Sequence, residues 1–160
     1  DIMKKAILIA LKICLVIFFG FFLCNELSGP SMSDTDFSVV EENVIKTMGT
    51  YELEKQGGQA IKKYLSINSA DYENIQYYKS SDPMNVREIV IVKFKDPNQG
   101  EAFKEAMQQR IDTQINAFNG YGVEQVALLK KSVISLDMNY AIYVTCETAN
   151  DVVSIYKEQL

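Results

Sequence analysis

An N-terminal apolar run constrains this chain more than any other feature of its sequence. Residues 6–24 are apolar except for Lys12, two lysines precede them, and residues 25–36 contain no basic residue. Positive charge confined to the N-terminal side of an apolar run is typical of a membrane-targeting element whose C-terminal end leaves the cytoplasm. We therefore expect residues 1–24 to form a membrane anchor or signal segment.

The same run is compatible with three processing outcomes. Residues 6–23 would give about 27 Å of helix at ~1.5 Å per residue, near the lower limit for a membrane span, with the ammonium of Lys12 snorkelling to the headgroups. If Lys12 belongs to a charged leader, the remaining 12 apolar residues have signal-peptide length. Lipidation at Cys24 would need small residues before the cysteine, and bulky ones stand there. We favour a retained single-pass anchor; lipidation at Cys24 and plain secretion stay open.

The rest of the chain is the size of one domain, and its charge is acidic. Residues 25–36 are polar loop formers without periodicity, which indicates a linker, and we expect an extracytoplasmic globular domain over residues 37–160. Beyond residue 24 there are 13 basic and 20 acidic residues, a net charge of about −7. Because lysines and arginines are scattered singly in so acidic a domain, nucleic acid is excluded as a partner.

Apolar periodicity predicts an α+β fold. Helical spacing of apolar residues over residues 37–48 and 58–65 predicts two helices before the first strand. Alternating or apolar runs predict two pairs of strands, with a long helix after the first pair, a short helix before the second and a final helix near the C-terminus. The expected strands are residues 73–80, 86–95, 132–136 and 140–147. The further expected helices are residues 97–118, residues 123–130, which could instead begin a strand, and a final helix that carries Val152, Ile155 and Tyr156. We expect an antiparallel four-stranded sheet with packed helices, built from strand-strand-helix twice and preceded by two helices.

The cysteines and the absence of histidine argue against catalysis. Cys14 and Cys24 lie in the N-terminal segment, so Cys146 is the single thiol of the domain. It alternates in register with Ile142 and Val144, which indicates a small buried side chain. Without histidine, a nucleophile-elbow serine or a Gly-rich phosphate loop, the chain is predicted to be no enzyme and to hold no cofactor.

Acidic pairs and adjacent tyrosines give weaker signals. Glu41 with Glu42, and Glu101 with Glu105, lie on predicted amphipathic helices, where such acids are usually solvated, so we expect no metal site. Tyr77 and Tyr78 alternate faces of a predicted strand. One of their rings should be in the core, and the other should be exposed, where it could stack on a sugar.

Several short motifs occur in an order that resembles a known family. They are Ile61-Lys62-Lys63-Tyr64, Asp71-Tyr72-Glu73, Ser80 to Met84, Arg87 to Lys93, Gln109-Arg110, Phe118 to Tyr121, Gln125 and Asn139-Tyr140. In this order they resemble the domain-of-unknown-function family 4358 over residues 37–160. The resemblance implies an exported protein of Firmicutes, anchored by a lipid or in the membrane, and it implies no activity. It also implies, more remotely, a partner among the machinery that modifies cell-surface polymers.

Four residues are our candidates for a recognition site: Arg110, Gln114, Tyr121 and Tyr140. Arg110 and Gln114 are four residues apart, so a helix places both on one face beside its apolar stripe. They could present a fork-shaped donor and an amide toward Tyr121 or Tyr140, as a site for a carboxylate or a sugar. Arg110→Lys would then weaken binding and leave the Tm nearly unchanged. The alternative interpretation is that Arg110 pairs with a surface carboxylate and the tyrosines fill the edge of the core.

Three classes of function follow from these observations. The first is a non-catalytic accessory domain at the cell membrane that docks onto an envelope protein. The second is a small-ligand or glycan-binding module with a pocket near Arg110 and Tyr121. The third is an enzyme that works with carboxylates, lysine or tyrosine alone. We expect the first, with a single membrane pass and the domain outside the cytoplasm.

Overall fold

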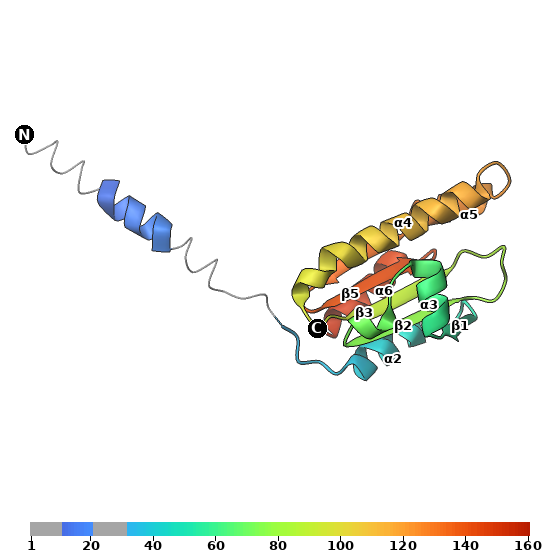
Figure 1. Cartoon of the computed structure of the whole chain (residues 1–160), viewed down its shortest axis with the longest axis horizontal. Helices are drawn as coiled ribbons and strands as arrows, with labels where there is room; N and C mark the ends of the chain where they lie inside the picture. The colour runs from blue at the N-terminus through green and yellow to red at the C-terminus, as the bar shows by residue number, and fades with distance from the viewer. Residues whose placement is uncertain (1–10, 21–31) are drawn as a thin grey trace, which may run out of the picture. The chain divides into compact units, whose positions relative to one another are not determined.

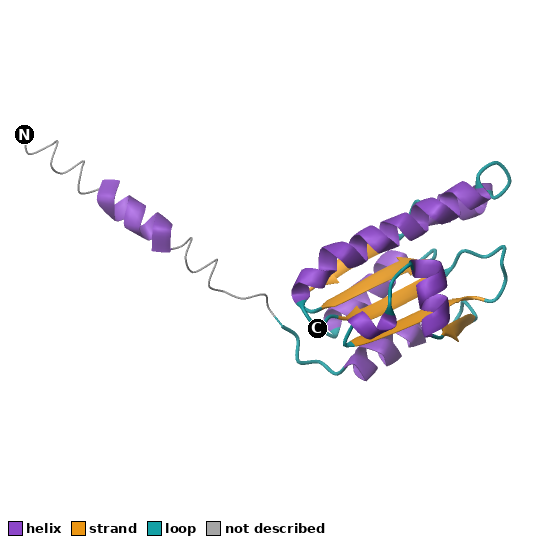
Figure 2. Cartoon of the chain, viewed as in Figure 1, coloured by secondary structure: helices purple, strands orange, loops and turns teal. Residues whose placement is uncertain are grey.

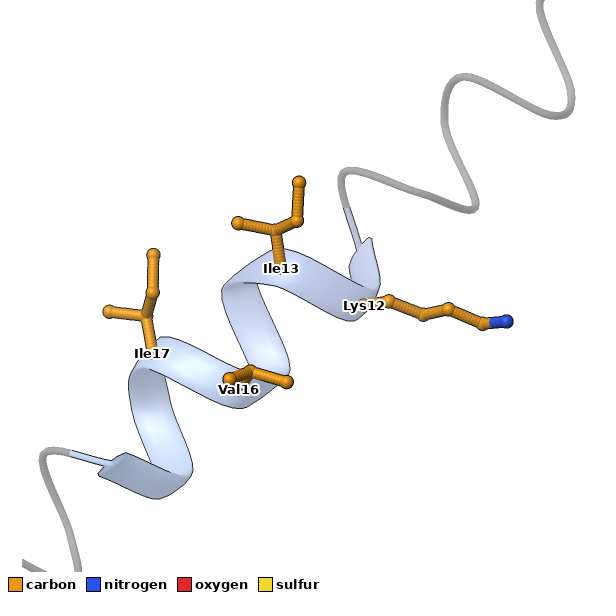
Figure 3. Close-up of a pocket in the computed structure, with 4 residues that line it drawn as sticks. All are labelled: Lys12, Ile13, Val16 and Ile17. Carbon is orange, nitrogen blue, oxygen red and sulfur yellow. The ribbon is translucent and has the colours of Figure 1, made fainter.

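Figure 1 shows the computed structural model, which describes residues 11–20 and 32–160. The chain divides into two compact units, Asp1–Ser31 and Met32–Leu160. In the first unit, residues 11–20 are helical and their side chains are exposed. Figure 3 shows Ile13 and Ile17 projecting from the same side of this helix, while Lys12 points away from them.

The predicted anchor is described only in part. Of residues 1–24, residues 1–10 and 21–24 lie outside the described residues. Within residues 11–20 and 32–160, no helix has the length and apolar character that a membrane crossing requires.

A five-stranded antiparallel sheet forms the centre of the second unit. The strands lie in the order β1-β2-β3-β5-β4. All residues of β5 and five of the six in β3 are buried, which confirms an interior position for the predicted apolar strand at residues 86–95. The strands are β1 (Leu53–Gln56), β2 (Asn74–Ser80), β3 (Glu88–Lys93), β4 (Val133–Asp137) and β5 (Tyr140–Thr145).

The prediction of four strands was wrong because it missed β1. This strand reads Leu-Glu-Lys-Gln and pairs with β2 at the edge of the sheet, with Leu53 opposite Ser80. An edge strand is held by backbone hydrogen bonds to one neighbour, so it needs no alternating apolar pattern. β1 lies between α2 (Phe37–Thr47) and α3 (Gly58–Leu65), so the prediction that both helices precede the first strand was also wrong.

Helices cover both faces of the sheet (Figure 2). α2 and α6 pack on one face, while α3, α4 and α5 pack on the other. The predicted strand-strand-helix units are confirmed as β2-β3-α4 and β4-β5-α6, and the α+β class is confirmed with them. The remaining elements are α4 (Gly100–Phe118), α5 (Val123–Leu129), α6 (Ala149–Glu158) and two short 3₁₀ helices, η1 (Ser69–Asp71) and η2 (Pro97–Gln99).

Residues 32–36, predicted as the end of the linker, lie against the domain. The Ser33 amide donates to Asn139 Oδ1 over 2.8 Å, and Asn139 Nδ2 donates back to the Ser33 carbonyl over 3.3 Å. The Tyr140 hydroxyl donates to the Thr35 carbonyl over 2.7 Å. The chain therefore joins the domain at the turn between β4 and β5, which we call the tether end.

The strand register defines an opposite end of the domain. Lys93 of β3 lies beside Tyr140 of β5, so the C-terminal end of β3 is at the tether end and the loop between β2 and β3 is at the other. The junction of α4 and α5 lies next to that loop, because Gln125 Oε1 accepts a hydrogen bond from the Val86 amide over 3.2 Å. We call residues 81–87 together with residues 119–125 the far end.

Candidate functional site

A buried network of charged and polar side chains surrounds Glu88, the first residue of β3. Its side chain is 1% exposed and faces α4, on the same side of the sheet as Val90. Burial of an unpaired carboxylate would cost several kcal/mol, so Glu88 needs partners that carry hydrogen-bond donors.

Arg110 supplies the opposite charge from the middle of α4. Its Nε lies 3.0 Å from Glu88 Oε1 and its Nη2 lies 2.9 Å from Oε2, a bidentate pair. Burial by itself would lower the pKa of the Arg110 guanidinium, but the hydrogen bonds and the charge of Glu88 raise this pKa above its usual value. Arg110 is therefore a permanent cation in the fold.

Two tyrosines complete the coordination of the carboxylate. The Tyr77 hydroxyl donates to Glu88 Oε2 over 2.7 Å, and the Tyr143 hydroxyl donates to Oε1 over 2.9 Å. Burial, and then the charge of Glu88, raise the pKa of both phenols. Thr145 Oγ1 donates to the Tyr143 hydroxyl over 2.8 Å and lies 2.7 Å from Ser132 Oγ. The network therefore extends from α4 across β2, β3 and β5 to the start of β4.

Gln114 joins this network one helical turn after Arg110. In the orientation that satisfies both ends of its amide, Gln114 donates to Glu88 Oε1 over 3.3 Å and accepts from Arg110 Nη2 over 2.8 Å. The structure thus brings Arg110 and Gln114 together, as their spacing on a helix predicts.

The two other candidate residues lie elsewhere. Tyr121 follows the C-terminus of α4, is largely exposed and packs its ring 5.6 Å from that of Phe118. Tyr140 is buried on the opposite face of the sheet, where its ring stacks 6.3 Å from Phe37. Neither tyrosine meets Arg110. The alternative interpretation paired Arg110 with a surface carboxylate, whereas the structure pairs Arg110 with the buried carboxylate of Glu88.

Sequence reasoning missed Glu88 and Tyr143 as members of a site. A signal was present, because Glu88 alternates in phase with Val90 and so belongs to a buried face. The prediction for the tyrosine pair is confirmed for Tyr77, which is buried. The expectation that the other ring is exposed was wrong, because Tyr78 is half-buried and its hydroxyl donates to Glu41 of α2.

A hollow opens beside the network, between α3 and α4. It has a volume of about 230 Å³. The Arg110 guanidinium carbon lies 5.4 Å from the centroid of the Tyr64 ring, so Arg110 borders both the network and the hollow. We call it the α3–α4 hollow; its lining residues are Lys63, Tyr64, Leu65, Ser66, Ala106, Gln109, Arg110 and Thr113.

Acidic residues and cysteine do not assemble a metal or nucleophile centre in the described part of the chain. Residues 11–20 and 32–160 contain no group of three His, Cys, Asp or Glu side chains that could hold a metal ion. Glu41 accepts from Lys55 over 3.0 Å. Cys146 is buried in the cluster that contains Ile142 and Val144, as its register predicts, and burial raises the pKa of its thiol.

One comparison with known proteins gave a match. The family model described as Domain of unknown function (DUF4358) matches residues 46–146, a span that contains all five strands, the Glu88 network and the α3–α4 hollow. Neither a curated protein nor a solved structure matches the chain.

Proposed function

This chain belongs to the DUF4358 family, and we propose that it is a membrane-anchored, extracytoplasmic accessory domain that docks onto an envelope protein and performs no catalysis. The observation that carries this proposal is a set of exposed apolar side chains at the far end. The remote implication of the resemblance, a partner within the machinery that modifies cell-surface polymers, belongs to the same proposal.

The far end presents three large apolar side chains on the loop between β2 and β3 and on the adjoining junction of α4 and α5. Met84 is 53% exposed, Tyr121 is 63% exposed and Val123 is 78% exposed. Single exposed apolar residues are common on soluble domains, but several on neighbouring loops favour a protein-docking surface. Tyr121, a candidate site residue from the sequence, contributes to this surface.

The position of the tether end also supports the far end as the docking surface. Residues 32–36 are hydrogen-bonded there, so the far end is the end of the domain without a covalent link to the proposed anchor. In residues 11–20, seven large apolar side chains are more than half exposed, and such a surface favours a lipid environment. The positive charge before this run supports placing the domain outside the cytoplasm.

The Glu88 network supports a non-catalytic role. Both carboxylate oxygens accept from Arg110 and from a tyrosine, so the acceptor oxygens of Glu88 are engaged within the network. A general base or nucleophile needs a free lone pair directed at a substrate, and Glu88 keeps none exposed.

Photocrosslinking in the native membrane tests the docking proposal. A photoreactive phenylalanine at position 121 of the full chain should give one discrete adduct with an envelope protein, and Val123→Ser should reduce its yield. Val39→Ser, which alters an exposed valine of α2, is the matched control and should leave the yield unchanged. Equal losses from both variants, or the absence of an adduct, would count against docking at the far end.

Protease treatment of intact protoplasts tests the topology separately. Added protease should digest the domain, and mass spectrometry of the protein should recover an N-terminus that retains the apolar run. Protection of the domain from the protease would contradict an extracytoplasmic position. A lipidated N-terminus at Cys24 would show that the protein is a lipoprotein and not a protein with a retained anchor.

A second candidate function is a small-ligand or glycan-binding module. The observation that favours it is the α3–α4 hollow, whose lining combines an aromatic ring with cationic and amide side chains. Variants in the hollow would then abolish binding, while Val123→Ser would not.

A further inference from the structure

Three cationic side chains from three elements converge on the ring of Tyr64. The Nζ of Lys63 on α3 lies 4.9 Å from the ring centroid, and the Nζ of Lys79 on β2 lies 5.7 Å from it. The guanidinium of Arg110 on α4 lies 5.4 Å from the same centroid. One exposed cation over a tyrosine is stabilised by roughly 0.5–1 kcal/mol, but three positive charges around one ring also repel each other.

Ion pairs balance the charges of this cluster only in part, although Glu54 of β1 and Glu88 of β3 lie opposite Lys79 in the sheet register. Arg110 is neutralised by Glu88. Among the described residues, neither Lys63 nor Lys79 forms an ion pair, and the Lys79 ammonium donates to the carbonyl of Ser80 over 2.6 Å. The lining of the hollow contains Lys63 and Arg110 but no carboxylate, in a domain whose overall charge is acidic.

Three other hollows of residues 32–160 that contain cations differ in this respect. Arg87 borders two hollows at the far end and forms an ion pair with Glu147. The hollow along α2 contains Lys46 together with Glu41 and Glu42. Excess positive charge in a hollow thus distinguishes the space between α3 and α4 from these surfaces.

The hollow also holds side-chain donors, two neutral and one of the guanidinium, that have no partner within the described part of the chain. The Ser66 hydroxyl, the Gln109 amide and Arg110 Nη1 form no hydrogen bond there. Ammonium, guanidinium, hydroxyl and amide donors together suit an anion with several acceptor oxygens, and a carboxylate offers two. A phosphate group offers more acceptor oxygens and more negative charge.

We propose that the α3–α4 hollow binds the phosphate group of a phosphorylated polyol or sugar. This inference rests on the second candidate function and names its ligand class. A volume of about 230 Å³ leaves room for a polyol beside the phosphate. The same phosphate chemistry could come from a soluble or polymeric polyol phosphate or from a glycerophospholipid headgroup.

The test uses the full chain, labelled with nitrogen-15, in a maltoside detergent without phosphate. Glycerol phosphate should shift the amide signals of residues 63–66 and 106–113 in a saturable manner, and added salt should weaken the binding. Lys63→Gln combined with Lys79→Gln should raise the Kd about tenfold, because two charges that attract the phosphate are lost. Lys62→Gln, an exposed lysine one position away on α3, is the matched control and should change the Kd less than about twofold.

Addition of phosphatidylglycerol to the micelles distinguishes the source of the phosphate. Shifts of the same amides with this lipid alone would support the site and assign it to a headgroup, whereas shifts with glycerol phosphate would support the site and assign it to a soluble or polymeric ligand. Absence of shifts with both probes would overturn the proposal, as would an equal loss of affinity in Lys62→Gln. Val123→Ser should bind glycerol phosphate normally, so failure of docking and failure of this site are separable.

Discussion

The carboxylate of Glu88 and the guanidinium of Arg110 meet in a bidentate pair across the interface of β3 and α4, with N–O distances of 3.0 Å and 2.9 Å. Both side chains are removed from solvent, with exposed fractions of 1% for Glu88 and 11% for Arg110. Because the two hydrogen bonds require a fixed mutual orientation, we expect the pair to specify where α4 lies along the sheet.

Removal of one member of this pair should lower the free energy of unfolding more than removal of both. Glu88→Leu leaves the Arg110 charge buried without a partner, so the free energy of unfolding should fall by about 3–5 kcal/mol. Glu88→Leu combined with Arg110→Met should lose less, because no charge is then stranded. Urea unfolding of both variants measures this, with Glu105→Leu on the exposed side of α4 as control. Equal losses in the single and double variants would contradict the expectation.

Arg110→Lys should lower the Tm, which reverses the expectation drawn from the sequence. Lysine keeps the charge but loses the planar fork, so one of the two bonds to Glu88 is lost at a cost of about 1–2 kcal/mol. Thermal unfolding followed by circular dichroism measures the change, and Lys104→Arg on the same helix is the control. An unchanged Tm would show that the second bond is dispensable.

Stability should fall in alkaline solution through the buried tyrosines. Burial and the charge of Glu88 raise the pKa of Tyr77 and Tyr143 above the value of about 10 that tyrosine has in an unfolded chain. Below pH ~10 the folded and the unfolded chain both keep these phenol protons, and the free energy of unfolding is unaffected by them. Above pH ~10 the unfolded chain releases these protons while the folded chain still holds them, so the free energy of unfolding decreases as the pH rises. Urea unfolding between about pH 8 and about pH 11 should show this decrease. The stability of Tyr143→Phe should decrease less steeply with pH, because about one proton fewer is released on unfolding. A slope equal to that of the parent chain would exclude Tyr143 as a cause.

Cys146 should behave as a packed side chain without reactivity. Cys146→Ala should cost about 1–2 kcal/mol through lost contacts in the cluster of α2, α6 and the sheet. In a chain with serine at positions 14 and 24, a bulky thiol reagent should label Cys146 slowly in buffer and quickly in urea. Rapid labelling of the folded chain would contradict its burial.

Asn139 should hold the chain at the tether end. Asn139→Ala removes the acceptor for the Ser33 amide and the donor for the Ser33 carbonyl, so stability should fall by about 1–3 kcal/mol. Hydrogen exchange of the amides in residues 33–35 should accelerate, and Asn116→Ala, an exposed change on α4, should leave it unchanged. Unaltered exchange in Asn139→Ala would mean that other contacts hold this segment.

The sequence predicted the elements whose stability is local or periodic. Residues 58–65 carry a helical apolar stripe, and residues 97–118 were expected as a helix, of which η2 and α4 are the observed parts. The alternation that places Cys146 beside Ile142 is equally local, and all these features appear in the structure. The same alternation places Tyr140 on the face of β5 that carries Ile142, which is opposite to the face that Arg110 contacts.

The sequence by itself determined the fold class, the strand-strand-helix order and the shared face of Ile142, Val144 and Cys146, because these depend on spacings of two and 3.6 residues along the chain. Only the tertiary structure decided that β1 exists, since an edge strand with one apolar residue is held by the backbone of β2. It also decided that Arg110 lies against Glu88 and that Lys63, Lys79 and Arg110 converge on Tyr64. These contacts join residues of different elements, and they depend on how each helix crosses the sheet, a quantity that no local spacing encodes.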